Sequence, residues 1–295
     1  MSRSVSCGHC PDSHSGERPC LASATTKANS WLLIEHSGPW PYKIEDLGLP
    51  VVDRALQYGV RPQLIRRTGR RAPTPPLRVY AGWSGADPWL ETRVVADHAE
   101  LEALDLEAVA RGRRPGFGEP TVEPLLMVCT HAKRNACCAR TGTPLARRLA
   151  ESYGDLVWET SHVGGDRYAA NLVCLPHGIY YGAMDGESAG TAVDAYLRGE
   201  VVLDRLRGRA GLPEPAQAAE HFVRAHTGLL GLDQVRVISV TGTGPYMTRV
   251  TAAGSVWSGT VELVENAGGC GHECDETAQT YQMRDLALHS EAALV

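Results

Sequence analysis

Residues 125–182 read LLMVCTHAKRNACCARTGTPLARRLAESYGDLVWETSHVGGDRYAANLVCLPHGIYYG. The apolar run 125–128 predicts a buried strand that delivers Cys129 to its end, followed by a loop that carries His131, Lys133, Arg134 and the pair Cys137–Cys138. A helix is expected near 143–153, and then a strand at 156–160 that leads to His162 in a glycine loop. Soft ligands at strand ends beside glycine loops indicate a metal or redox centre.

The part of the chain before residue 120 and the part that begins at residue 125 have a similar order of elements. Upstream, the sequence predicts strands at 31–36, 63–67, 77–83 and 89–96, with helices at 49–58 and 100–111. Downstream of 160 it predicts strands at 171–175 and 179–183 and a helix at 188–198. The fold class is therefore expected to be α/β, a thioredoxin-like mixed sheet with flanking helices, and the repeated order suggests two such units.

Four regions are expected along the chain. Residues 1–29 form a flexible arm with cysteines, 30–120 an α/β N-terminal unit, 121–210 a second, thioredoxin-like unit, and 211–295 a helix followed by a β-rich tail. In the tail, a helix at 216–228 precedes strands at 235–240, 246–252 and 255–264, and the end of the chain fades into a polar helix or coil.

Composition excludes several classes of protein. The net charge is −5 and there is no basic stripe, so nucleic acid is not an expected partner. No apolar run approaches the roughly 20 residues that span a bilayer, and the polar N-terminus lacks a signal-peptide core. We expect a cytoplasmic protein, in which the nine cysteines are ligands, redox thiols or buried side chains rather than a disulfide framework.

Two groups of thiols lie near the ends of the chain. Cys7 and Cys10 form a C-x-x-C, but no strand precedes it and Pro11 follows, so surface thiols or a labile metal contact are alternatives to a thioredoxin-type dithiol. Cys270 and Cys274 flank a histidine; they could complete a zinc site with Cys7 and Cys10 or be oxidisable thiols of a tail.

Within 125–182, the ligand candidates are Cys129, Cys138, His162 and Asp166. Two thiolates nine residues apart suit a loop that wraps around a centre, and the glycines after His162 allow close backbone approach. Three other side chains are expected to have simpler roles: Cys137 as a spare or packing thiol, Cys174 as part of the core, and His131 as a supporting or surface residue. Asn171 is expected to bond the backbone of the glycine loop. Three cations, Lys133, Arg134 and Arg167, are expected either to donate hydrogen bonds to the centre or to be solvated.

Several motifs in the same order resemble the sucrase/ferredoxin-like family. They are CTHAKRNACC at 129–138, HVGGDRYAAN at 162–171, PHGIYYG at 176–182 and WLLIEHSGPW at 31–40, and the resemblance covers most of residues 20–230. It implies a thioredoxin-like ferredoxin domain, at 121–210, that binds a [2Fe-2S] cluster. Fungal relatives use two cysteines and two histidines, in the pattern Cys, eight residues, Cys, then His-x-x-x-His.

The resemblance assigns Cys129 and Cys138 as thiolate ligands and His162 as the first imidazole, while Asp166 stands where relatives have the second histidine. The fourth ligand could be Asp166, His177 or Cys174. We expect an electron carrier with a [2Fe-2S] cluster and an unidentified redox protein partner, rather than a stand-alone enzyme. The alternatives are a zinc-binding or cluster-less structural or interaction protein of the same fold, and a thiol oxidoreductase that uses Cys7 and Cys10.

Overall fold

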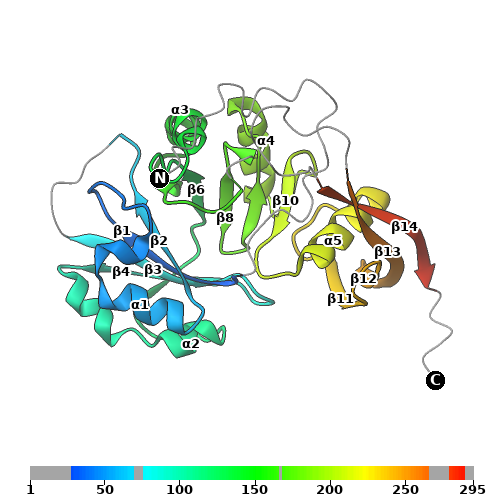
Figure 1. Ribbon diagram of the computed structural model, residues 1–295, viewed down its shortest axis with the longest axis horizontal. Coiled ribbons are helices and arrows are strands. Elements are labelled where there is room, and N and C mark those ends of the chain that lie inside the picture. The colour runs from blue at the N-terminus through cyan, green and yellow to red at the C-terminus, as the bar shows by residue number, and fades with distance from the viewer. Residues whose placement is uncertain (1–27, 70–75, 166–167, 266–278, 290–295) are drawn as a thin grey trace.

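Two sheets organise the chain in a computed structural model that describes residues 28–69, 76–165, 168–265 and 279–289. A curled ten-stranded mixed sheet is flanked by helices, and a four-stranded antiparallel sheet lies toward the C-terminal end (Figure 1). The expected α/β class, with a mixed sheet, flanking helices and a small β-rich C-terminal region, is confirmed. No helix in the described ranges is long and apolar enough to cross a membrane.

The first half of the large sheet carries its helices on one face. Its elements are β1 (Ser30–Glu35), η1 (Ile44–Leu47), α1 (Pro50–Gln57), β2 (Arg61–Arg66), β3 (Leu77–Trp83), β4 (Trp89–Val95), η2 (His98–Ala103), α2 (Leu106–Ala110) and β5 (Glu119–Thr121). One helix was expected at 100–111, but two short ones form, because Asp97 and Asp105 each cap a separate start with a side-chain oxygen.

The second half follows the same plan. Its elements are β6 (Leu125–Cys129), α3 (Ala136–Tyr153), η3 (Gly154–Leu156), β7 (Val157–Thr160), β8 (Leu172–Leu175), β9 (Ile179–Tyr181), α4 (Gly186–Leu197) and β10 (Leu206–Arg209). The strand order is β2-β1-β3-β4-β5 in the first half and β7-β6-β8-β9-β10 in the second. Each half opens with a parallel pair and continues antiparallel, and the antiparallel pair β2–β7 joins them into one sheet.

Helix α3 starts seven residues earlier than expected. A start near 143 would have placed Pro144 in the first turn, where proline is favoured. Instead Asn135 caps the helix, its side chain accepting the Cys137 N–H at 2.8 Å, and Pro144 lies inside. Cys137 and Cys138 therefore belong to the first turn of a helix and not to a loop, which corrects the expectation from the sequence.

Alternation along the strands sends neighbouring side chains into different cores. Leu126 and Val128 of β6 face α3 and α4, whereas Met127 and Cys129 face a core on the opposite side of the sheet. That second core is shared by the two halves, and Tyr80 from the first meets Trp158 from the second, edge to face, with ring centroids 5.9 Å apart. The halves are thus packed together as well as hydrogen-bonded.

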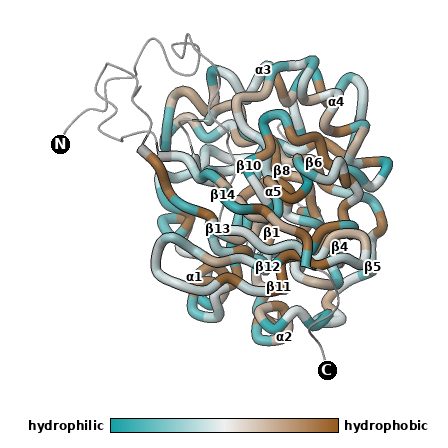
Figure 2. The backbone as a smooth tube through the Cα atoms, turned by 90° about the vertical axis from the view of Figure 1, so that its right-hand side faces the viewer, coloured by the Kyte–Doolittle hydropathy of each residue, from teal (hydrophilic) through white to brown (hydrophobic). Residues whose placement is uncertain are grey.

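The C-terminal sheet packs against a helix of its own. Helix α5 (Glu214–Thr227) covers β11 (Val235–Thr241), β12 (Tyr246–Ala252), β13 (Ser255–Glu265) and β14 (Gln279–His289), and these four strands lie toward the viewer in Figure 2. The buried Arg224 ties α5 to the following loop by donating to the Leu229, Gly231 and Leu232 carbonyls. The expected polar helix or coil near the end was wrong for 279–289, which form β14 by pairing with β13.

Candidate metal centre

Two parallel strands bring Cys129 and His162 to the same end of the sheet. Strands β6 and β7 are parallel, and Cys129, the last residue of β6, pairs with Thr160, the last of β7. His162 follows two residues later, so it leaves the sheet beside Cys129. Because parallel neighbours end on the same side, local sequence and one pairing suffice to bring these two together.

Helix α3 returns over this edge and adds the second thiol. Cys138 lies in its first turn and is fully buried. The helix comes very close to the strand at Gly142, where a Cβ atom would lie 2.0 Å from the carbonyl oxygen of Cys129. Only a glycine allows this approach, so Gly142 sets the distance between the helix that carries Cys138 and the strand that carries Cys129.

Cys129, Cys138 and His162 form a compact group of soft donors. Their ligand atoms all lie within 4.8 Å of one another, and within the described ranges this is the one group of three or more Cys, His, Asp or Glu side chains that could hold a metal ion. Both cysteines are buried and His162 is half-buried. Two thiolates and an imidazole suit zinc or iron–sulfur iron.

The surroundings favour the thiolate form of Cys129. Hydrogen bonds from the Cys138 thiol, the His162 side chain and the backbone N–H groups of His131 and Val163 lower the pKa of Cys129, and together they outweigh burial, which acts in the opposite direction. A thiolate is the form that binds metal. The hydrogen-bond donors around Cys129 therefore favour its negatively charged form.

One nitrogen of the His162 imidazole lacks a hydrogen-bond partner within the described part of the chain. Nδ1 of His162 is buried and makes no hydrogen bond to any residue that the structure describes. A buried polar atom without a partner calls for an explanation, and a bound metal ion is one of them. The donor set, its burial and this nitrogen all fit a soft metal centre.

The backbone of His162 is held from both sides. Its N–H donates to Nδ1 of His131 at 3.2 Å, and its carbonyl accepts from Arg61 at 3.3 Å and from Gln63 at 3.2 Å. Arg61 and Gln63 lie on β2, in the other half of the sheet. Burial lowers the pKa of the His131 imidazole.

The contacts of Arg61 and Gln63 with His162 were not expected from the sequence, because no local signal shows that β2 pairs with β7.

The glycine loop after His162 is fixed by a buried amide. Asn171 donates to the Gly165 carbonyl at 2.8 Å and accepts from Arg207 at 2.7 Å, while Arg207 also donates to the Gly164 carbonyl at 3.1 Å. The expectation that Asn171 satisfies the loop backbone is confirmed. The part played by Arg207 was not foreseen.

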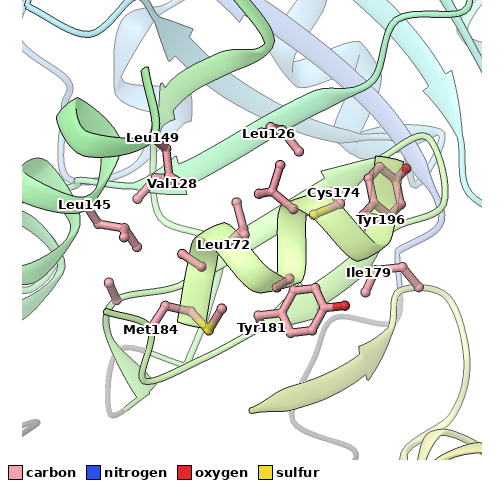
Figure 3. Close-up of a cluster of buried hydrophobic side chains, with 14 of the residues drawn as sticks. Leu126, Val128, Leu145, Leu149, Leu172, Cys174, Ile179, Tyr181, Met184 and Tyr196 are labelled. Carbon is pink, nitrogen blue, oxygen red and sulfur yellow. The ribbon is translucent and has the colours of Figure 1, made fainter. Parts of the chain in front are cut away.

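The other thiols and histidines of the stretch have different surroundings. Cys174 lies among Leu126, Leu172 and Tyr196 on the opposite face of the sheet from Cys129, and burial raises its pKa (Figure 3). Its expected place in the core is confirmed, and it cannot be the fourth ligand. Cys137 is buried but not part of the three-donor group; its Sγ lies 3.6 Å from a nitrogen of Arg140.

His177 is excluded as a ligand by its position. It follows β8, which runs antiparallel to β6 and pairs Leu175 with Leu125, so it lies beyond the start of β6. Cys129 is at the other end of that strand, roughly 13 Å away at the usual rise per residue. The Nδ1 of His177 is 2.8 Å from the hydroxyl of Tyr196.

The remaining candidates divide into exposed residues and residues outside the described ranges. Lys133 and Arg134 are exposed, and the Arg134 guanidinium lies 4.7 Å from the centre of the Tyr42 ring. The expected donors to the centre are therefore not these two cations; instead, the backbone N–H groups of His131 and Val163 donate to Cys129. Asp166 and Arg167 lie outside the described residues, as do the four terminal thiols at positions 7, 10, 270 and 274.

Comparison with known proteins gives one result. No curated protein and no solved structure matches the chain. A model of the sucrase/ferredoxin-like family matches residues 21–208, which include both halves of the large sheet up to β10 and all three members of the donor group. The match spans more than half of the 295 residues. This chain therefore belongs to the sucrase/ferredoxin-like family.

Proposed function

We propose that this protein is an electron carrier in which Cys129, Cys138 and His162 hold a [2Fe-2S] cluster. The observation that carries the proposal is the compact group of two buried thiols and one imidazole, within 4.8 Å of one another, in a chain of this family. Asp166, four residues after His162, is the proposed fourth ligand. A carboxylate is a harder donor than imidazole, so it would make this site unlike one with two histidines.

When bound, the cluster would supply a site for one electron. The protein residues would set how readily that electron is accepted. Donors that stabilise the Cys129 thiolate include the N–H groups of His131 and Val163. Burial of Cys129 and Cys138 keeps water from the sulfur atoms, and replacing thiolate by imidazole raises the reduction potential. The partner would be a redox protein.

Anaerobic purification of the full chain tests the proposal. We expect a coloured protein with about two irons and two sulfides per chain, and an EPR signal after reduction. Cys129→Ser should lose colour and iron, whereas His162→Cys should keep a cluster at a lower potential. Protein that contains neither iron nor sulfide after anaerobic preparation and reconstitution would refute the proposal.

A zinc site is the second candidate, favoured by how close together the donors lie. Around a single tetrahedral ion with metal–sulfur bonds of about 2.3 Å, two ligand atoms are about 3.8 Å apart, and the three donor atoms here all lie within 4.8 Å. Colourless protein with one zinc per chain, lost in Cys138→Ser, would support this candidate over the cluster.

A further inference from the structure

We propose that His131 is a positioning residue that orients the His162 imidazole toward the metal. This inference rests on the proposed function, in that it needs a metal held by His162. It adds a residue that is not itself a ligand but decides whether one of the ligands faces the site.

The first support is the contact between the two histidines. The N–H of His162 donates to Nδ1 of His131 at 3.2 Å. The His131 side chain is 5% exposed, and its ring meets the edge of Trp40 at a centroid distance of 5.8 Å and an angle of 90°. The acceptor is therefore itself held in one orientation by packing, which is what a residue that fixes another must have.

The second support is an asymmetry in how the His162 backbone is held. Its carbonyl has two donors, Arg61 and Gln63, so the loss of either leaves the other. Among the described residues, the His162 N–H has one acceptor, Nδ1 of His131. Removing that acceptor leaves the N–H of the half-buried His162 unpaired and removes the restraint on that side of the residue, so the imidazole is no longer held in one orientation.

The test compares variants that separate hydrogen bonding from packing. His131→Phe keeps a ring against Trp40 but has no acceptor, and His131→Asn places a carbonyl oxygen close to where Nδ1 was. The matched control is His177→Phe, which removes a half-buried histidine bonded to Tyr196 at the far end of β6. Circular dichroism and urea unfolding establish that each full-length variant is folded.

Two readouts report on the site. Co²⁺ is added to metal-free protein in competition with a chelator, and pulsed EPR of the iron–sulfur form measures the coupling to ¹⁵N-labelled histidine. We expect His131→Phe to weaken Co²⁺ binding by about 10- to 100-fold, as loss of a group that orients a ligand does, and to change the nitrogen coupling. His131→Asn and His177→Phe should stay within a few-fold of wild type.

The outcomes separate this inference from the function on which it rests. Wild-type protein that takes up neither Co²⁺ nor a cluster refutes both. If wild type binds metal and His162→Ala removes the nitrogen coupling, but a folded His131→Phe variant matches wild type, the function stands and the positioning role is wrong. If His131→Phe does not fold, His131→Ala and His131→Asn are compared instead, and equal Co²⁺ affinities of these two overturn the inference.

Discussion

Replacing Gly142 by alanine is expected to move helix α3 away from Cys129 and to open the donor group. A Cβ atom at this position would lie 2.0 Å from the Cys129 carbonyl oxygen and 3.1 Å from its carbon. The obstacle is backbone, so no side-chain rotation relieves it. Cβ contacts under 3.0 Å essentially do not occur, so the helix and the strand must separate by at least 1.0 Å at this point.

The expected loss of stability follows from two opposing effects. Alanine is favoured over glycine inside a helix by about 1 kcal/mol. Forcing an extra methyl into a packed interface typically costs about 1–3 kcal/mol, and a backbone contact belongs at the upper end of that range. Cys138, one turn earlier on the same helix, would shift with it, and a site loses its geometry when a group moves by more than about 0.5 Å.

Gly190 provides the matched control because it also lies inside a helix but has room. A Cβ atom there would meet only the Tyr153 hydroxyl, at 3.8 Å. Both variants gain the same helix propensity, so the difference between them isolates the clash. We expect Gly190→Ala to be more stable than wild type by about 0.5–1 kcal/mol, and Gly142→Ala to be less stable than Gly190→Ala by about 1–3 kcal/mol.

Urea unfolding gives the two free energies, and Co²⁺ titration of metal-free protein gives the effect on the site. Gly142→Ala should bind Co²⁺ more weakly than wild type, and Gly190→Ala should bind it equally well. If Gly142→Ala is as stable as Gly190→Ala and binds Co²⁺ like wild type, α3 does not approach β6 as described, and the account of how Cys138 reaches Cys129 is refuted.

Three further variants test other parts of the structure. Asn171→Leu removes the buried amide that donates to the Gly165 carbonyl and accepts from the Arg207 guanidinium, so we expect urea unfolding to show a loss of about 1–3 kcal/mol, and an unchanged stability would contradict this. Asp185 caps α4, and its bonds to Ser188 lower its pKa to about 2, so Asp185→Ala should cost about 1 kcal/mol at pH 7. Because the folded pKa is below the ordinary 3.8, this difference should be constant above pH 4 and shrink as the pH falls toward 2, and a difference that grows with acid would refute it. Cys174→Ala should retain the metal content of wild type in elemental analysis, and a loss of metal would show that this thiol is not confined to the core.

The local elements of the fold could be predicted because they depend on residues that are close in sequence. Runs such as 125–129 and 171–175 are apolar enough to be strands wherever they are placed, and a strand that ends in Cys129 is visible without any partner. The order of elements then indicated the α/β class. The same order suggested a repeat, which corresponds to the two equivalent strand orders in the sheet.

The donor group was likewise visible in sequence, since Cys129, Cys138 and His162 lie within one βαβ unit and within the motifs that resemble the family. Whether they bind a cluster stays a prediction. The helix start was misjudged because Pro144 favours a later start, while the cap at Asn135 and the packing at Gly142 determine the observed one. Which cysteines face the group depends on that start.

The sequence by itself determined most of the strands of the large sheet, the repeated order and the three soft donors. Only the tertiary structure decided what surrounds them. The pairing of β2 with β7 joins residues 97 positions apart, such as Leu64 and Ser161, and it places Arg61 and Gln63 on the His162 carbonyl. Likewise, β14 forms only because β13 offers an edge. Periodicity and caps act over a few residues, whereas these contacts arise when distant segments share a sheet, so no local pattern records them.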